Sequence, residues 1–226
     1  MSNAADSERV ADLARRVVAD HDPKSVPIPE YLAACYDAGL SWVLERTTVE
    51  DARNVYAAIR LANPAGLGEV QKQDVSAPPT LPLRDVMALA NERDLIAGQY
   101  ADGFLFVFNQ VVPQLVQQTN RLKNLEWAIV ETQLETLRVA RDSHIRRKRG
   151  SAEATAVKRK ALDIASLDAP DGRRAFLDFD AWLRADQHAR NPGTTADLIA
   201  AGLFVALREK RIALETPFVW DGHPFV

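Results

Sequence analysis

The sequence predicts an all-α protein, a single globular bundle of about eight helices joined by long loops rich in proline and glycine. Apolar residues recur at three- and four-residue spacing along most of the chain, which is the period of a helix. No pair of alternating apolar and polar runs flanks a hairpin turn, so the sequence gives no support to strands. The composition, with 47% hydrophobic and 26% charged residues, is that of ordinary soluble domains.

The first third of the chain predicts three helices. Valines and leucines at helical spacing indicate an amphipathic helix over 6–20. Three prolines over 22–29 predict an extended connector, and a second helix is expected over 30–46. A third helix follows, because Thr48 and Asp51 form a capping-box pattern at its start.

A long loop is predicted over 63–82. Its first six residues contain a proline and two glycines, Gly66 and Gly68, where the backbone can approach a ligand closely. A helix stop followed by a turn explains the same residues equally simply. Loops of this length in a compact domain are often functional.

From Leu83 to Val112 the pattern predicts one unbroken helix, because no turn signal separates its apolar residues. Arg93 and Asp94 lie inside it. Charged residues there indicate either a solvated helix face or one wall of a polar pocket. The remaining helices are expected over 124–139, 152–164, 172–184 and 194–209.

The last of these helices, over 194–209, is the most informative. Asn191-Pro192-Gly193 is a strong turn signal, and Thr194 can cap the helix with Asp197 three residues later. From 198 to 207 the helix is apolar on nearly every side, which predicts burial. Its first turn could bind an anion through free backbone N–H groups, although an ordinary capped core helix is the commoner structure.

Charge and cysteine content narrow the classes of function. The net charge of −3 argues against general nucleic-acid affinity, so no nucleic-acid partner is expected. No apolar run reaches the length of a membrane span, and the polar, acidic N-terminus differs from a signal peptide. The single cysteine, Cys35, cannot form an intramolecular disulfide, which favours a reducing, cytoplasmic location and no membrane partner.

A basic segment interrupts this acidic chain. Residues 141–160 contain eight of the 28 Lys and Arg residues and only two acids. Such an island indicates a phosphate-rich partner, and Asp142 and Ser143 beside it could hold a metal ion or orient a hydroxyl group. Two plainer interpretations remain open: a favourable cation cluster after a helix, and a structural role for His144.

Three regions resemble the triphosphoribosyl-dephospho-CoA synthase family, over about 48–212. Asn191-Pro-Gly-Thr-Thr-Ala-Asp-Leu-Ile-Ala-Ala-Gly-Leu-Phe is similar to its C-terminal signature. Asp142-Ser-His-Ile-Arg-Arg-Lys-Arg-Gly150 resembles its second signature, an Asp-Ser or Asp-Thr followed by a short basic segment and glycine. The segments at 58–68, 74–75 and 93–100 resemble its branch of uncharacterised homologues.

The resemblance implies an all-α fold and a reaction in which ATP and 3′-dephospho-CoA give 2′-(5″-triphosphoribosyl)-3′-dephospho-CoA and adenine, with Mg²⁺ bound alongside ATP. Arg147 and Lys148 would then contact phosphate. Asp142 would bind Mg²⁺ or assist the attacking 2′-hydroxyl, and Asp197 would cap its helix or join the catalytic site. The other residues expected to bind phosphate or nucleotide are Ser143, Gly150, Asn191, Gly193, Thr194, Thr195, Gly66, Gly68 and Arg93.

The resemblance divides the chain into N-terminal helices and linker over 1–47, a synthase-like domain over 48–212 and a tail over 213–226. Residues 1–47 match neither the Lys-Pro-Gly loop nor the Asn-Thr-Asn-Leu-Gly type signature of the family. Two functions therefore stay open. One is a transferase acting on ATP and dephospho-CoA or another small acceptor. The other is a truncated or degenerate homologue that binds nucleotide or phosphate beside a partner chain supplying the missing signature.

Overall fold

The computed structural model is all-α, as the sequence predicts. It describes residues 39–62, 67, 69–167, 169–213 and 215–218, and within these ranges it contains helices and no strand. The helix predicted over 6–20, the connector over 22–29 and most of the helix over 30–46 lie outside the described residues. The division of the chain near residues 47 and 212 stays a prediction.

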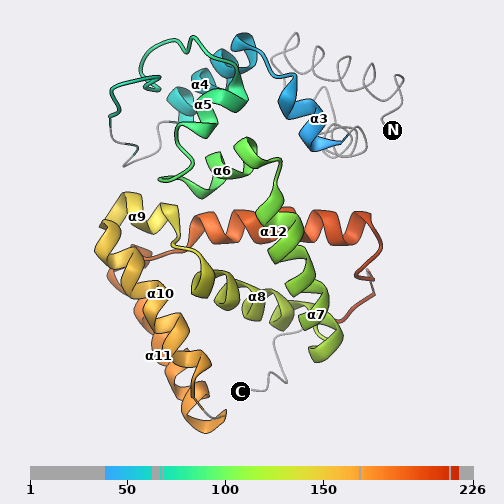
Figure 1. Ribbon diagram of the computed structural model, residues 1–226. Coiled ribbons are helices and arrows are strands. Elements are labelled where there is room, and N and C mark those ends of the chain that lie inside the picture. The colour runs from blue at the N-terminus through green and yellow to red at the C-terminus, as the bar shows by residue number, and fades with distance from the viewer. Residues whose placement is uncertain (1–38, 63–66, 68, 168, 214, 219–226) are drawn as a thin grey trace.

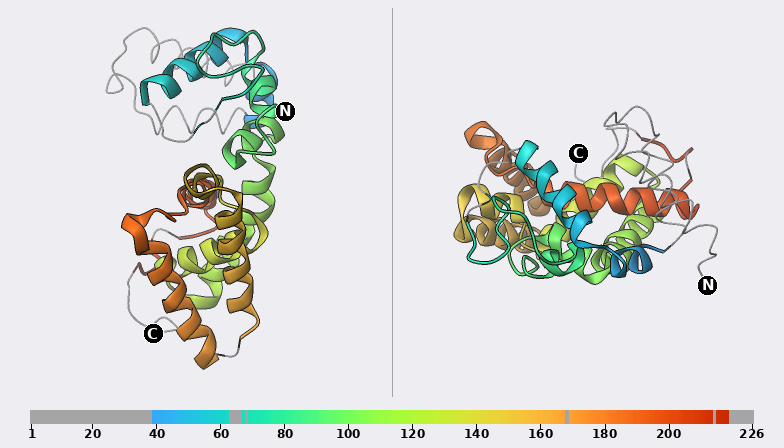
Figure 2. Two further views of the ribbon diagram at one scale, coloured as in Figure 1. Left: turned by 90° about the vertical axis from the view of Figure 1, so that its left-hand side faces the viewer. Right: turned by 90° about the horizontal axis from the view of Figure 1, so that it is seen from above.

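The N-terminal part of the described chain forms a group of short helices. These are α3 (Leu40–Glu45), α4 (Val49–Ala62), α5 (Leu83–Ala88) and α6 (Leu95–Asp102). Figure 1 shows them together at one end of the molecule, and the left-hand view in Figure 2 also shows this group set apart from the other helices.

Local capping fixes the start of α4 where the sequence predicts it. The Thr48 backbone N–H donates to Asp51 Oδ2 at 2.7 Å, and the Asp51 N–H donates back to Thr48 Oγ1 at 3.2 Å. The capping box is therefore confirmed. The helix ends at Ala62, and 69–82 is non-helical, so the predicted loop is confirmed where it is described.

Asp74 organises this loop. Its Oδ2 accepts from the Val70 N–H at 2.8 Å, and its Oδ1 accepts from the Ser76 N–H and hydroxyl at 2.9 and 2.6 Å. The Tyr56 hydroxyl of α4 donates to the Gln73 carbonyl at 2.7 Å. The loop is thus tied to itself and to α4.

The prediction of one unbroken helix from Leu83 to Val112 is wrong. The chain turns after α5, and Asp94 starts α6 by accepting from the Ile96 and Ala97 N–H groups at 2.8 and 3.3 Å. The helix then ends at Gly103, with left-handed φ of 71°. An aspartate that caps a helix and an Asp-Gly pair that ends one outweigh the continuous apolar pattern here.

The helical assignment of 104–112 is confirmed, with a wider turn than expected. The chain forms a π-helix, η1 (Val107–Val111), that continues into α7 (Val112–Leu122). Pro113 lies in the first turn of α7, where its missing N–H costs least.

Four predicted helices are confirmed in the C-terminal part, namely α8 (Leu125–Val139), α10 (Ser151–Ala165), α11 (Ala169–His188) and α12 (Gly193–Arg208). A further short helix, α9 (Ser143–Arg149), contains four residues of the basic segment, Arg146, Arg147, Lys148 and Arg149, which therefore do not simply follow the end of α8. Gly150, with φ of 88°, joins α9 to α10.

Helix α12 is the central element of the core, as its apolar sequence predicts. Figure 1 shows it crossing the middle of the molecule, with α8 and α10 on one side and α6 on the other. It packs on η1 and α7 through Leu198, Ile199 and Val205, all buried. Among the helices of the described residues, none combines the length and apolarity that a membrane crossing requires.

Candidate active site at a junction of helix N-termini

Asp142 joins the starts of α9 and α12. Its Oδ1 accepts from the His144 and Ile145 N–H groups at 2.9 and 3.0 Å, which caps α9. Its Oδ2 accepts from the Thr195 N–H and hydroxyl, both at 2.8 Å. The carboxylate is only 1% exposed, and these four bonds fill its acceptor positions.

The predicted cap by Thr194 is therefore wrong. Pro192 occupies the N-cap position of α12 without a side-chain bond, and the capping acceptor is Asp142 from another helix. Thr194 instead holds α9: its hydroxyl lies 2.9 Å from Ser143 Oγ and accepts from the His144 N–H at 3.1 Å.

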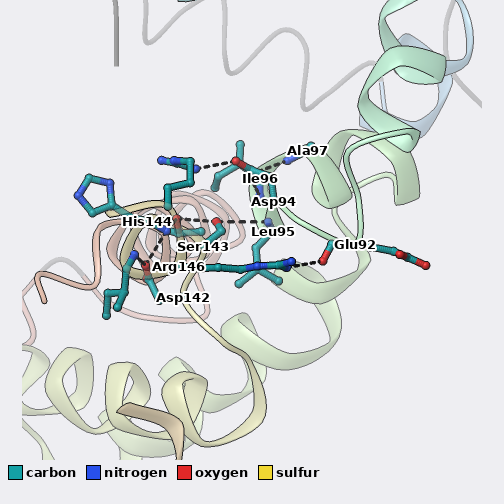
Figure 3. Close-up of polar contacts among 12 residues, drawn as sticks. Glu92, Asp94, Leu95, Ile96, Ala97, Asp142, Ser143, His144 and Arg146 are labelled. Carbon is teal, nitrogen blue, oxygen red and sulfur yellow. Dashed lines mark hydrogen bonds and ion pairs between the residues drawn. The ribbon is translucent and has the colours of Figure 1, made fainter. Parts of the chain in front are cut away.

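The start of α6 completes the junction. The Leu95 N–H donates to Ser143 Oγ at 3.4 Å. Figure 3 shows Asp94 and Leu95 facing Ser143, with Asp142 on the other side of the α9 start. Three helix N-termini thus converge, and each adds positive electrostatic potential to the same region.

Two arginines of α9 link it to the α6 side. Arg147 Nη1 donates to Asp94 Oδ2 at 2.6 Å, and Arg146 Nη1 donates to the Glu92 carbonyl at 2.9 Å. Arg147 Nε is buried and has no hydrogen-bond partner within the described residues. The Arg147 guanidinium therefore keeps donor capacity beyond its ion pair.

Asp197 and His144 experience opposite electrostatic effects beside this junction. Partial burial, followed by the negative charge of Asp142, raises the pKa of the Asp197 carboxyl. Partial burial, followed by the positive charges of Lys148 and Arg147, lowers the pKa of the His144 imidazole. Both changes favour the neutral forms of these side chains.

The turn before α12 is rigidly held. The Gly193 N–H donates to the Asn191 carbonyl at 2.9 Å, and a Cβ on Gly193 would lie 3.3 Å from the His144 ring. Arg190, which directly precedes Asn191, is 8% exposed and donates hydrogen bonds to Glu153 and Asp186. Asn191 itself is exposed.

A cavity of about 600 Å³ lies beside the junction, between α4, the loop before α5, α6 and α9. Arg93, Asp94, Arg146 and Arg147 line its charged part. Mostly aliphatic side chains line the remainder, together with Tyr56, Tyr100, Lys72, Gln73 and Asp74. The cavity is of the size that encloses a small-molecule ligand.

Comparison with known proteins gives one match. The model of the ATP:dephospho-CoA triphosphoribosyl transferase family matches residues 24–216, most of the chain. The chain belongs to this family. Among curated proteins and among solved structures, no significant match was found. Membership supports a transferase of the triphosphoribosyl-dephospho-CoA synthase type.

In this triphosphoribosyl transferase family member, most of the predicted site residues fall in one region. The fold brings Asp142, Ser143, Thr194 and Thr195 into direct contact, while Arg93 and Arg147 line the adjacent cavity. Lys148, Gly150, Asn191 and Asp197 are exposed around them. Gly66 and Gly68 lie outside the described residues.

Sequence reasoning missed two groups in this region. Asp94 was noted only as one wall of a possible pocket, yet it caps α6 and pairs with Arg147. Arg146 was not singled out at all. A capping signal was present at Asp94, since an aspartate followed by an apolar helical run is a typical N-cap.

The hydrogen bonds of Asp142 bear on the prediction that this residue binds a metal ion. A cation at Asp142 would have to displace one of its four hydrogen-bond donors. Within the described part of the chain, no group of three or more His, Cys, Asp or Glu side chains could hold an ion. Magnesium bound to ATP needs little more, because phosphates and waters supply most of its ligands.

Proposed function

We propose that this protein transfers the triphosphoribosyl group of ATP to 3′-dephospho-CoA and releases adenine. The C1–N9 bond of ATP breaks, and a bond forms between that C1 and the 2′-oxygen of the acceptor. The proton of the acceptor hydroxyl leaves with adenine, so the atoms balance. The triphosphate stays attached and has to be held throughout.

The convergence of the family-like segments carries this proposal. Thr195 lies 53 residues from Asp142 in sequence, yet both of its polar donors bond to the Asp142 carboxylate. Arg147 reaches Asp94 across a similar separation. One polar region is thus formed by the segments 93–100, 142–150 and 191–197. Segments without a common role need not meet in this way, so their contact supports a shared function.

The electrostatics of this region suit a polyphosphate. Arg93, Arg146, Arg147 and Lys148 surround it, and Arg147 keeps a buried Nε–H available for a phosphate oxygen. Arginine binds phosphate oxygens with two parallel hydrogen bonds, and lysine adds a point charge. Arg147 and Lys148 are proposed to hold the triphosphate while its ribose carbon becomes positively charged.

The aspartates take separate roles in this proposal. Asp142 fixes α9 against α12 and so sets the spacing of the basic side chains. Asp197 is exposed, and partial desolvation, followed by the negative charge of Asp142, raises the pKa of its carboxyl. It is the carboxylate available to assist the acceptor hydroxyl or to contact Mg²⁺ that arrives with ATP.

Adenine release tests the reaction directly. The protein is incubated with ATP, Mg²⁺ and dephospho-CoA, and adenine and the new conjugate are measured by chromatography with mass detection. Both products should appear together and depend on dephospho-CoA. ATP binding without adenine would instead favour the non-catalytic partner-subunit alternative.

The phosphate role is tested by thermal protection. ATP with Mg²⁺ should raise the Tm of the wild-type protein, and Arg147→Ala/Lys148→Ala should abolish that rise. The matched control is Arg173→Ala/Arg174→Ala on α11, which removes the same charge from two exposed residues away from the site. Equal protection of the first variant and the wild type would remove Arg147 and Lys148 from the proposed site.

A further inference from the structure

We infer that the cavity beside the junction binds the pantetheine arm of the acceptor, rather than the purine base of either nucleotide. The identity of the acceptor rests on the proposed function. The location of the arm is inferred from the cavity itself, because a cluster of charged side chains lines one part of it and mostly apolar side chains line the other.

The charged part of the cavity lies against the junction. Arg93, Asp94, Arg146 and Arg147 line it, and the Arg147–Asp94 pair and the Arg146 bond to Glu92 hold the two arginines of α9 at this edge. Phosphates can remain here beside cations and near solvent. Moving them deeper would strip their hydration without replacement, which is strongly unfavourable.

The remaining wall is mostly apolar and comes from four elements, and its polar members are Tyr56, Lys72, Gln73, Asp74 and Tyr100. Side chains from α4, the loop before α5, α5 and α6 surround the space, and they are Val55, Ile59, Val75, Met87 and Ile96. A ligand part that enters here has to be apolar and flexible enough to follow branched side chains. The pantetheine arm is a long, mostly aliphatic chain that ends in a thiol.

Three of the polar side chains in this wall, Tyr56, Gln73 and Asp74, are already engaged in hydrogen bonds. Gln73 Nε2 donates to Thr80 Oγ1 at 2.8 Å, and Gln73 Oε1 accepts from the Thr80 N–H at 2.9 Å. The Tyr56 hydroxyl donates to the Gln73 carbonyl, and Asp74 is committed to the loop. A base buried here would have only Lys72 and Tyr100 as further side-chain partners in this wall, so most of its ring nitrogens and its amino group would stay unpaired, which is costly.

The extent of the cavity points the same way. At about 600 Å³ it is large enough for a drug-sized ligand, whereas a single flat base would leave much of it unfilled. An arm that extends into this space from a diphosphate at Arg93 and Arg146, with the triphosphate of ATP at Arg147 and Lys148, fills it. Binding energy from this non-reacting arm would then orient the acceptor hydroxyl.

Two matched ligands distinguish the contribution of the pantetheine arm to binding from that of the nucleotide. ADP is dephospho-CoA without the pantetheine arm, so titration calorimetry with each measures the contribution of the arm. The wild-type protein should bind dephospho-CoA at least about tenfold more tightly than ADP, because the arm buries apolar surface. Equal affinities would overturn the inference.

Two substitutions locate the arm. Ile59→Trp fills the cavity from α4 and should reduce dephospho-CoA affinity to that of ADP, while ADP and ATP bind as before. Leu61→Trp, on the same helix but 90% exposed and outside the cavity, should change nothing. Leu89→Trp, at a 58% exposed position on the cavity rim, gives the same test without risk to the fold and should also weaken dephospho-CoA selectively.

A loss of ADP and ATP affinity as large as that of dephospho-CoA in these variants would place the purine in the cavity and refute the inference. Failure of the proposed function has a different signature. Absence of adenine release, with the arm-dependent affinities as expected, would remove the reaction and leave the arm site. Adenine release with equal affinities for ADP and dephospho-CoA would support the reaction and remove the arm site.

Discussion

Replacing Asp142 with Asn tests whether this residue joins two helices or holds a metal ion. The substitution keeps the shape of the side chain but exchanges one acceptor oxygen for an NH₂ group. The remaining oxygen can satisfy the two backbone donors of α9. The NH₂ group then faces Thr195, whose hydroxyl can turn to accept a hydrogen bond, while its N–H, in a residue 1% exposed, loses its acceptor.

The expected cost follows from that loss. Hydrogen bonds to a charged group contribute about 1.5–3 kcal/mol, and a buried unsatisfied donor costs about 1–3 kcal/mol. These terms overlap, so Asp142→Asn should lower the free energy of unfolding by about 2–4 kcal/mol. For a chain of this size the Tm should fall by about 4–16 °C. Thr195→Val, which removes only the hydroxyl bond to this carboxylate, should cost about 1.5–3 kcal/mol.

Urea unfolding followed by circular dichroism measures both variants, with and without Mg²⁺. Magnesium alone should shift the wild-type protein and Asp142→Asn equally. A free energy of unfolding for Asp142→Asn within about 0.5 kcal/mol of the wild type would show that Asp142 does not hold α9 and α12 together. Stabilisation by Mg²⁺ that disappears in Asp142→Asn would make Asp142 a metal ligand, as the sequence suggests.

Three further predictions concern elements that hold the site in place. Gly150 has φ of 88° and ψ of 167° with no atom near its missing Cβ, so Gly150→Ala should cost about 1–3 kcal/mol in urea unfolding from backbone strain alone; an unchanged midpoint would contradict this. A Cβ on Gly202 would lie 2.6 Å from Val111 Cγ1, so Gly202→Ala should lower the free energy of unfolding by up to about 2 kcal/mol despite better helix propensity, and a gain in stability would count against the close packing. Hydrogen bonds, first from the Ser76 hydroxyl, lower the pKa of Asp74 from its ordinary 3.8 to about 2; Asp74 therefore stabilises the fold above about pH 4 and loses that effect as the pH falls towards 2. Asp74→Asn should accordingly flatten the acid side of the stability–pH curve, and an unaltered curve would show that this carboxylate does not couple to folding.

Sequence reasoning succeeded where the determinants are local. The capping box at Thr48 and Asp51 acts over a few residues and is visible in the sequence. The apolar composition of α12 likewise predicts its burial without knowledge of its neighbours.

It failed where a distant or competing interaction decides. Thr194 follows a turn and looks like a cap, but Asp142, from an element 53 residues away from Thr195, takes that role. The apolar pattern after Leu83 hides the break at Asp94, since periodicity cannot show that a side chain bonds to its own backbone. Helix α9 has seven residues and four basic side chains in its last turn, so it has too few apolar positions to produce a helical signal.

The long sequence separation within the site also governs when it can form during synthesis. Thr195 leaves the ribosome well after Asp142, and until α12 docks, Asp142 and Ser143 at the start of α9 lack their partners Thr195 and Thr194. The apolar faces of η1 and α7 at Val111 and Leu115 remain uncovered over the same interval. Domains fold as cooperative units, so assembly of this site coincides with the final folding step. A nascent chain that has not released α12 therefore lacks the junction, and the nucleotide binding proposed there would report the completed fold.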